Sequence, residues 1–441
     1  MPVSKGTLTP VAQSFPRIIH CIQFMKIWIL QTGEPLHSDD FGLRPMRAIN
    51  LTNALIEKGH HVTLWSSCFF HQKKCHRTNS FSQVYISPLL TILLIPSMGY
   101  KSNIGIDRLI DHFQLAFNLK RVLDSNSYEL PDIAFIGYPP IEIASVMISW
   151  LKHRQVPTIL DVKDLWPHIF VEAFPRLIRF PARIILDPYF RLAKQAIRNA
   201  SVLTSMTNSY LDFILDFAMR KRSTFDTVLS LIPSHISTSD SELKEALKWW
   251  EYFGLDFSHS NRIVFVGSLS QAFSFTYIRD AIKMLRDANV PIEFVICGRG
   301  GDEFLIKHLF SDIPSVYFPG WISSSQICAL MNRSFATIAP YKNTLNFTKN
   351  FPNKIIDSLG FGVPVITSLK GEVQRFIVEN ETGIFCNDDP QSWFNAFCSI
   401  YHDAKLRSKL SSNSLMEYNQ RFTFSAVYGS FVKKMEDLVS A

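Results

Sequence analysis

The sequence predicts an α/β protein with two Rossmann-like domains that face a central cleft. Short apolar runs alternate with helical stretches twice along the chain, which is the pattern of β-α-β units and parallel sheets. A stretch rich in Ser, Glu, Lys and Trp separates the two series and predicts a linker with a short helix over 236–260. With 441 residues, of which 47% are hydrophobic, the chain is long and apolar enough to bury two cores.

The first series predicts a domain over 25–235. It begins with a buried strand at 26–31, a loop that carries Gly33 and Gly42, and a helix near 44–58. The strands that follow are expected at 61–65, 133–136, 158–162 and 202–205. We expect ligand contacts in the loops after these strands, because open parallel sheets bind ligands at the carboxyl ends of their strands.

The second series predicts a domain over 261–415, in which strand, glycine and helix recur. Its strands are expected at 262–266, 292–296, 315–318, 336–339, 364–367 and 383–386. Glycines at strand ends, such as Gly267 and Gly298, allow the backbone to turn tightly or to approach a ligand. Residues 416–441 predict a carboxy-terminal helix, and whether it crosses back to the first domain is open.

The composition indicates which classes of binding partner and which cellular location are expected for this protein. The formal net charge of +7 suits anionic partners such as nucleotide phosphates or a membrane surface; we expect no nucleic-acid partner. Seven cysteines without CxxC pairing favour reduced thiols in the cytoplasm, and no apolar run reaches the roughly 20 residues of a membrane span. We interpret residues 1–24, which lack a signal-peptide pattern, as a disordered extension or a start-site artefact.

The most informative stretch is 351–372, which reads FPNKIIDSLGFGVPVITSLKGE. Asn353 and Lys354 start a predicted helix, although the helix dipole disfavours a cation at that end. A bound diphosphate would remove this conflict, and Asp357 could accept the hydroxyls of a ribose. The alternative is that Lys354 and Asp357 form an ordinary i,i+3 surface pair.

This stretch resembles the donor-site segment of family 4 GT-B glycosyltransferases, especially the bacterial aminosugar transferases of O-antigen and capsule assembly. Those proteins have a pattern like P-[SN]-K-x-x-[ED]-x-x-[AG]-x-G-x-P-V-I before a Gly-Glu loop, which is Gly371 and Glu372 here. The resemblance covers nearly everything from Met25 onward, through 33–42, GHHV at 59–62, DVKDLWPH at 161–168, IVFVGSL at 263–269, FPGWI at 318–322 and ATIAPY at 336–341.

The resemblance implies a retaining, metal-independent transferase that moves a hexose or N-acetylated aminosugar to a glycolipid or saccharide in surface polysaccharide synthesis. The donor would be a UDP- or dTDP-linked sugar, with no separate cofactor and no metal site. The donor-binding residues that the resemblance implies are Gly267, Arg299, Asn353, Lys354, Asp357, Gly371 and Glu372. The acceptor-side loop carries Gly33, Glu34 and Gly42.

Two departures from the family's pattern keep other functions open. The family has two glutamates separated by seven residues, and those positions hold Lys349 and Asp357 here. The loop after 262–266 has no basic residue, so Arg299 is either the phosphate contact or a solvated loop residue. The alternatives are a degenerate GT-B protein that binds a sugar nucleotide or a partner without turnover, and a sugar-nucleotide 2-epimerase. A nicotinamide oxidoreductase is disfavoured because no G-x-G-x-x-G follows the first strand of either half.

Asp164 and His168 are the candidate catalytic residues on the acceptor side. Both follow a predicted buried strand, and we expect them at the rim of the cleft. Either side chain could orient an acceptor hydroxyl, and Asp164 could act as a base. The alternative for Asp164 is that it caps the following helix.

Residues 176–198 mix six basic side chains with aliphatic and aromatic ones. This mixture suits the surface of a membrane with anionic lipids, so peripheral contact with the inner face of the plasma membrane is one reading. The alternative is an amphipathic helix packed on the first sheet, with its arginines in solvent.

Overall fold

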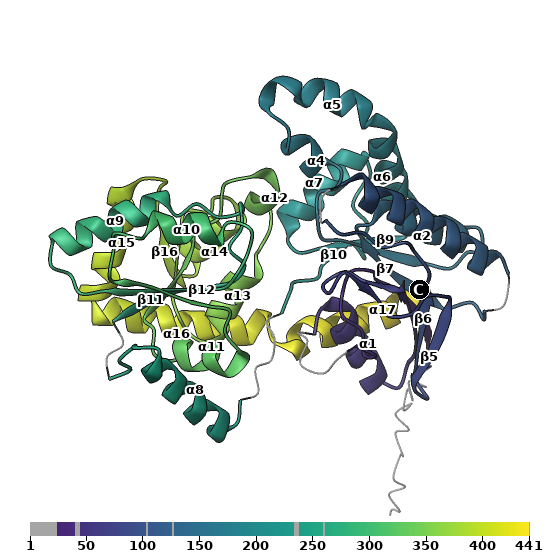
Figure 1. The fold of residues 1–441 in the computed structure, drawn as a ribbon. Helices are drawn as coiled ribbons and strands as arrows, with labels where there is room; N and C mark the ends of the chain where they lie inside the picture. Colours follow the sequence, from purple (N-terminus) through teal and green to yellow (C-terminus); the bar gives the residue numbers. More distant parts are fainter. Residues whose placement is uncertain are drawn as a thin grey trace, which may run out of the picture.

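The computed structural model describes residues 24–39, 45–102, 105–125, 128–232, 238–258 and 261–440. Each half of the chain forms its own sheet, and the two domains lie side by side (Figure 1). The predicted α/β class with two Rossmann-like domains is confirmed. No helix in these described ranges combines the length and the apolar character needed to span a bilayer.

The first domain is built on a sheet whose eight described strands run in the order β10-β9-β8-β7-β1-β2-β6-β5. Strand β5 is antiparallel to β6, and the other neighbouring pairs are parallel. The strands are β1 (Lys26–Leu30), β2 (His61–Ser67), β5 (Ser82–Ser87), β6 (Leu90–Ile95), β7 (Ile133–Tyr138), β8 (Thr158–Val162), β9 (Val202–Ser205) and β10 (Thr227–Val228). A short hairpin, β3 (Phe69–Phe70) and β4 (Cys75–His76), follows β2.

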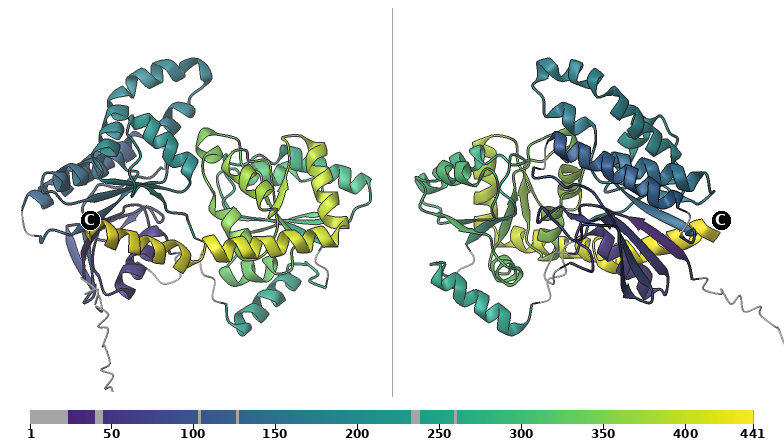
Figure 2. Two further views of the ribbon diagram at one scale, coloured as in Figure 1. Left: turned by 180° about the vertical axis from the view of Figure 1, so that it is seen from behind. Right: turned by 45° about the vertical axis from the view of Figure 1, so that its right-hand side comes forward.

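Helices cover both faces of this sheet because its central strands are apolar on both sides. In β1, Trp28 and Leu30 face one core, and Ile27 and Ile29 face the other, as the period of two in a strand requires. The first core is covered by α2 (Ile106–Asp124), α3 (Ile141–Lys152), α6 (Asp187–Asn199) and α7 (Asn208–Ala218), and the second by α1 (Arg47–Glu57). The short elements α4 (His168–Glu172), η1 (Arg176–Ile178) and α5 (Arg179–Ile185) extend outward from this domain (Figures 1 and 2).

The second domain is built on a parallel sheet whose six described strands run in the order β13-β12-β11-β14-β15-β16. The strands are β11 (Arg262–Val266), β12 (Glu293–Cys297), β13 (Val316–Gly320), β14 (Ala336–Ala339), β15 (Val365–Thr367) and β16 (Gly383–Phe385). The helices are α8 (Asp240–Tyr252), α9 (Thr276–Asp287), α10 (Glu303–Leu309), α11 (Ser324–Met331), α12 (Leu345–Thr348), α13 (Asn353–Gly360), α14 (Glu372–Glu379), α15 (Pro390–His402) and α16 (Ala404–Arg421).

The carboxy-terminal segment connects the two domains. Helix α16 packs on α13 of the second domain, and the chain then passes through a π-helical turn, η2 (Ser425–Gly429), into α17 (Ser430–Ser440). Phe431, Val432 and Met435 of α17 are buried in the core of the first domain. Figure 2 shows this segment, in yellow, running across both domains.

The segment predicted as a linker contains a helix that belongs to the second domain. Ser239 and Glu242 form a capping box that starts α8, and Trp250 is fully buried, with its indole N–H donating to the carbonyl of Gln326. Strand β5, which pairs antiparallel with β6, and the β3–β4 hairpin are elements that the sequence patterns did not predict.

Candidate active site

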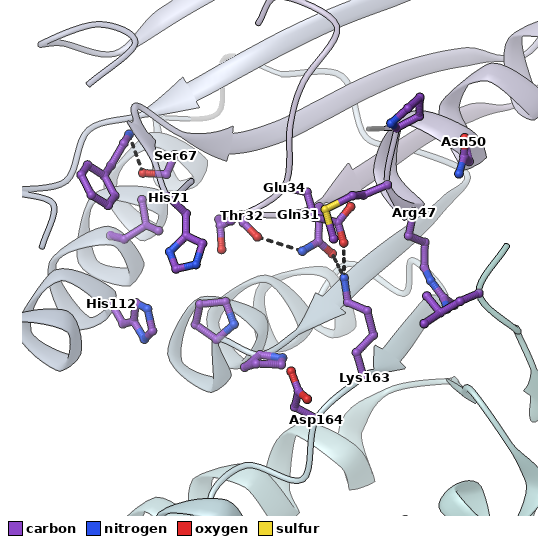
Figure 3. A pocket seen from close by; sticks show the side chains of 18 of the residues that line it. Gln31, Thr32, Glu34, Arg47, Asn50, Ser67, His71, His112, Lys163 and Asp164 are labelled. Atoms are coloured by element: carbon purple, nitrogen blue, oxygen red, sulfur yellow. Dashed lines mark hydrogen bonds and ion pairs between the residues drawn. The ribbon is translucent and has the colours of Figure 1, made fainter. Parts of the chain in front are cut away.

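A cavity of about 470 Å³ opens at the carboxyl ends of β1, β2, β7 and β8 (Figure 3). The loop after β1 contributes Gly33 and Glu34, the start of α1 contributes Arg47, and the loop after β8 contributes Lys163 and Asp164. This is the edge at which an open parallel sheet binds its ligands. The structure therefore brings two of the predicted acceptor-side glycine-loop residues and Asp164 into one cavity. Gly42 lies outside the described residues.

Glu34 holds the floor of the cavity in place. One of its carboxylate oxygens accepts the backbone N–H of Ala48 at 2.9 Å, in the first turn of α1, where the helix dipole favours a negative charge. The other oxygen pairs with Lys163. The same Lys163 ammonium donates to the side-chain oxygen of Gln31 at 3.1 Å. Because Glu34 is only 3% exposed and both oxygens are engaged, its role is to position Lys163 and α1.

A second buried pair lies below the cavity. Arg47 donates from Nη1 to Asp161 at 3.1 Å, and the hydroxyl of Thr204 donates to the same Asp161 oxygen at 2.9 Å. Burial raises the pKa of Asp161, while the nearby Arg47 and Lys163 charges lower it. Arg47 is 2% exposed, so the pair ties α1 to β8 in a region that water does not reach.

Asp164 stands where the two domains meet. Its side chain lines the cavity and forms a hydrogen bond with Asn346 of the second domain. Burial raises the pKa of Asp164, which makes its carboxylate a better proton acceptor near neutral pH. The alternative role as a helix cap is excluded, since α4 begins after Pro167 without a side-chain cap.

His168 is placed differently from our expectation. Its ring is not part of the cavity lining and packs edge-on against Phe190, Phe213 and Phe217 at centroid distances of 4.9, 5.3 and 4.6 Å. Burial lowers the pKa of His168 to about 4, so the ring is neutral at physiological pH. The sequence pattern could not distinguish this aromatic environment from the rim of a cleft.

The donor-side lysine lies at the start of α13, beside the end of β11. The ammonium of Lys354 donates to the carbonyl of Val266 at 2.5 Å and lies 4.8 Å from the centre of the Phe265 ring. Gly267 has φ of +153°, and a Cβ atom there would lie 1.2 Å from the lysine nitrogen. Only glycine therefore leaves room for this ammonium at the end of the strand.

Near Gly267, the loop after β11 is in direct backbone contact with the loop after β12. Leu269 donates its backbone N–H to the carbonyl of Arg299 at 2.9 Å, and the Gly267 carbonyl occupies the space that a side chain at Gly298 would need. The Arg299 side chain is exposed. Gly267, Arg299 and Lys354 thus come from three separate parts of the sequence to one sheet edge.

Asp357 and the Gly371–Glu372 loop complete the predicted donor set. Asp357 lies one turn after Lys354. The pKa values of Tyr341 and Tyr418 are raised by the burial of these tyrosines and by the negative charge of Asp357. Gly371 has φ of +80°, and its missing side chain allows the Thr348 carbonyl to approach. Glu372 begins α14 and accepts a hydrogen bond from Ser209 of the first domain.

The donor-side residues and the cavity are adjacent. Asn353, at the first position of α13, lines the cavity of the first domain. Thr207 of the first domain donates to the carbonyl of Lys349 at 2.5 Å, and the Lys349 ammonium lies 5.3 Å from the centre of the Phe213 ring. The domains are therefore in direct contact where the predicted donor and acceptor sites meet.

Several cavity residues were missed by the sequence argument, among them Arg47, Lys163, His71, Arg108 and His112. Lys163 stands in the DVKDLWPH segment, so the resemblance could have pointed to it. The others carry no local signal, because they reach the cavity only through the packing of α1, α2 and the β3–β4 hairpin. No three His, Cys, Asp or Glu side chains gather as a metal-binding group in the part of the chain that the structure describes.

Residues 260–403 match the family model described as "Glycosyl transferases group 1". The second domain is therefore similar to the group 1 glycosyltransferases. No curated protein matches the sequence. The family match lies entirely in the second domain and includes every predicted donor-binding residue from Gly267 to Glu372.

Solved structures extend the likeness to both domains. Sucrose-phosphate synthase from Thermosynechococcus elongatus is 16% identical with a TM-score of 0.66, over 94% of this chain and 99% of that one. HepE of Anabaena, solved with UDP and glucose, is 14% identical with a TM-score of 0.61, over 94% and 100%. WaaG, a glycosyltransferase involved in lipopolysaccharide biosynthesis, is 11% identical with a TM-score of 0.61, also over 94% and 100%. At these identities the likeness establishes the GT-B fold.

Proposed function

We propose that this protein is a retaining glycosyltransferase that moves a hexose or N-acetylated aminosugar from a UDP- or dTDP-linked sugar to a glycolipid or saccharide acceptor. The acceptor would belong to surface polysaccharide synthesis. The observation that carries the proposal is the position of Lys354. Its ammonium lies against Gly267 at the end of β11, next to a cavity in the facing domain.

The donor diphosphate would lie between the start of α13 and the loops after β11 and β12. Free N–H groups and the dipole at the start of α13 attract an anion there, and Lys354 and Arg299 add positive charge. These groups would stabilise the departing diphosphate without a metal ion or a cofactor. Asp357 is the residue that would accept the ribose hydroxyls, and the backbone N–H groups at Gly371 and Glu372 would hold the donor sugar.

Retention would follow from displacement on one face of the donor sugar. The acceptor oxygen forms the new bond to the anomeric carbon while the bond to the diphosphate breaks, and the departing phosphate oxygen takes the acceptor's proton. Asp164, beside Asn353 in the cavity, would orient the acceptor hydroxyl. The protein's main task is then to position the reactants, which can supply a large share of the rate.

Membrane contact is part of the proposal because two helical surfaces of the first domain expose apolar side chains. Residues of η1 and α5 expose Leu177, Phe180, Ile184 and Ile185, and α2 exposes Ile106, Ile110, Phe113 and Phe117. The α2 residues recur at helical spacing and form one face. Arginines 176, 179 and 183 stand among the α5 residues, so the surface combines apolar side chains with positive charge, as an anionic leaflet requires.

Nucleotide binding to the Lys354→Ala variant tests the donor assignment. Loss of a charged hydrogen-bond donor to phosphate should weaken UDP or dTDP binding about tenfold or more in calorimetry. Lys405→Ala, which removes an exposed lysine at the start of α16, is the matched control and should bind like wild type. Unchanged affinity in Lys354→Ala would refute the phosphate contact.

A binder without turnover is the second candidate. Lys349 replaces the first glutamate of the family's pattern, and its carbonyl and ammonium are engaged by Thr207 and Phe213 of the other domain. This position then serves domain contact and offers no carboxylate to a donor sugar. Incubation with a panel of nucleoside-diphosphate sugars and a glycolipid acceptor distinguishes the two functions. Release of nucleoside diphosphate supports a transferase, and binding without release supports a protein that binds without turnover.

A further inference from the structure

Helix α12 of the second domain is in direct contact with α7 of the first domain (Figure 1). Leu345 packs on the hydrophobic core of the first domain, and Asn346 lies beside Tyr210 of α7. The contact continues just after the helix, where Thr207 donates to the carbonyl of Lys349. The second domain therefore places the amide of Asn346, which the proposed mechanism does not use, among groups of the first domain.

Two donors of the first domain fix the orientation of the Asn346 amide. Its side-chain oxygen accepts the backbone N–H of Leu165 at 3.4 Å and the hydroxyl of Tyr210 at 3.3 Å. Both donors are held firmly, because Tyr210 is fully buried and Leu165 is 3% exposed. With its oxygen directed at these two donors, the amide has its NH₂ group, which can only donate, left for an acceptor nearby.

The acceptor beside this NH₂ group is the carboxylate of Asp164. Asp164 precedes Leu165 in the chain, so it stands next to the backbone N–H that Asn346 accepts, and the amide forms a hydrogen bond with it. Tyr210 faces the same carboxylate. Burial and the negative charge of Asp164 raise the pKa of Tyr210, so this hydroxyl keeps its proton and remains a donor to Asn346.

The cations around Asp164 do not by themselves fix its direction. Burial raises the pKa of Asp164, and the charges of Lys163 and Arg108 oppose that rise. The Lys163 ammonium is already engaged by Gln31 and Glu34. Attraction between separated charges depends on distance alone, whereas a hydrogen bond is directional. The amide supplied by the second domain is thus the group that can set the orientation of this carboxylate.

We propose that Asn346 is a positioning residue that holds the Asp164 carboxylate toward the acceptor. The inference rests on the proposed transferase function and adds a residue of the donor domain to its acceptor side. Asp164 lines the cavity of the first domain and Asn346 comes from the second, so the carboxylate is held only where the two domains are in contact. Support of this kind keeps reacting groups near the productive geometry, which is the main task of the protein in this mechanism.

The alternative is that Asn346 only fills space between the domains. The two roles predict opposite changes at Asp164 when the amide is removed. Loss of a hydrogen bond to the charged carboxylate raises its pKa. A loosened contact would instead admit water and lower the pKa, because burial is the main cause of its present rise.

An NMR titration of the Asp164 carboxyl carbon distinguishes these roles. The full chain is isotope-labelled at its aspartate carboxyl carbons, and the Asp164 signal is identified by its absence from Asp164→Asn. Asn346→Leu, which keeps the branched shape without the amide, should raise the pKa of Asp164. Asn346→Ala takes its place if the leucine variant does not fold.

Asn343→Leu is the matched control. It makes the same change in the same loop, and the Asn343 amide donates to Ser368 and Asp388 of the second domain. The pKa of Asp164 should stay at its wild-type value in this control. An unchanged or lowered pKa in the Asn346 variant overturns the proposal, as does an equal rise in the control.

Turnover provides the second measurement. With a donor sugar and acceptor that wild type converts, Asn346→Leu should lower kcat about tenfold or more and leave the KM for the donor nearly unchanged. In the Asp164→Asn background it should add little further loss, because both changes act through one group. Wild-type kcat, or a full further loss in that background, overturns the proposal. Failure of the proposed function is recognised separately, because wild type then releases no nucleoside diphosphate while the NMR titration still decides whether Asn346 holds Asp164.

Discussion

Replacing Gly267 with alanine should disable the donor site through Lys354. The new Cβ atom would lie 1.2 Å from the lysine nitrogen, whereas real Cβ contacts stay beyond 3.0 Å, so the ammonium must retreat by about 1.8 Å, the difference between these distances. That movement breaks its 2.5 Å hydrogen bond to the Val266 carbonyl and removes it from the proposed phosphate position. A lost charged hydrogen bond is worth roughly 1.5–3 kcal/mol, which corresponds to nucleotide binding weakened about ten- to hundredfold.

The measurement is calorimetric titration with UDP and dTDP, accompanied by urea unfolding. Gly254→Ala is the matched control, because Gly254 also has positive φ, +95°, but nothing within 4 Å of its Cβ position. Both variants should lose about 1–2 kcal/mol of unfolding free energy from backbone strain, and only Gly267→Ala should lose nucleotide affinity. In the Lys354→Ala background, Gly267→Ala should add little further loss, because both changes remove the same contact. Wild-type affinity in Gly267→Ala would refute the reasoning.

Three further predictions concern stability and the membrane. Asp161→Asn should lower the unfolding free energy in urea by roughly 3–5 kcal/mol, because it leaves the buried Arg47 without its charge partner, and a loss below about 1 kcal/mol would argue against that pairing. Burial depresses the folded-state pKa of His168 to about 4, so the unfolded state takes up a proton first and stability is lost as pH falls from about 6.5 toward 4; His168→Phe should reduce that loss, and an unchanged pH profile would contradict it. The double variant Leu177→Ser/Phe180→Ser should float less with anionic vesicles than wild type. Leu305→Ser, at an exposed apolar position of the second domain, should float like wild type. Equal flotation of wild type and both variants would dismiss the proposed membrane surface.

The sequence predicted the local structure of the proposed donor segment better than the composition of the cavity in the first domain. Lys354, Asp357, Gly371 and Glu372 lie within one stretch, so their order and spacing already indicate a strand-linked helix with a phosphate-binding start. Gly267 and Arg299 follow separate strands, and the rule for open parallel sheets predicts that both end at the same edge. These arguments need only local periodicity and the geometry of one sheet.

The cavity of the first domain depended on contacts between distant segments. Arg108 and His112 reach it because α2 packs across the sheet, and His168 leaves it because three phenylalanines from α6 and α7 surround its ring. Neither position has a local signal, since the sequence pattern of an amphipathic helix does not indicate which of its polar side chains will line a cavity. The helix α8 within the predicted linker joined the second domain for the same reason, through the burial of Trp250.

By itself, the sequence determined two parallel α/β domains and the local structure of the proposed donor segment, because strand and helix periodicity, glycines and a helix start are properties of contiguous residues. The tertiary structure alone decided which charges became buried pairs, as for Arg47 with Asp161, and which came to line the cavity, as for Arg108. The physical reason is that the energy of a charge depends on its distance from other charges and from water, and these distances are fixed only when the chain has packed.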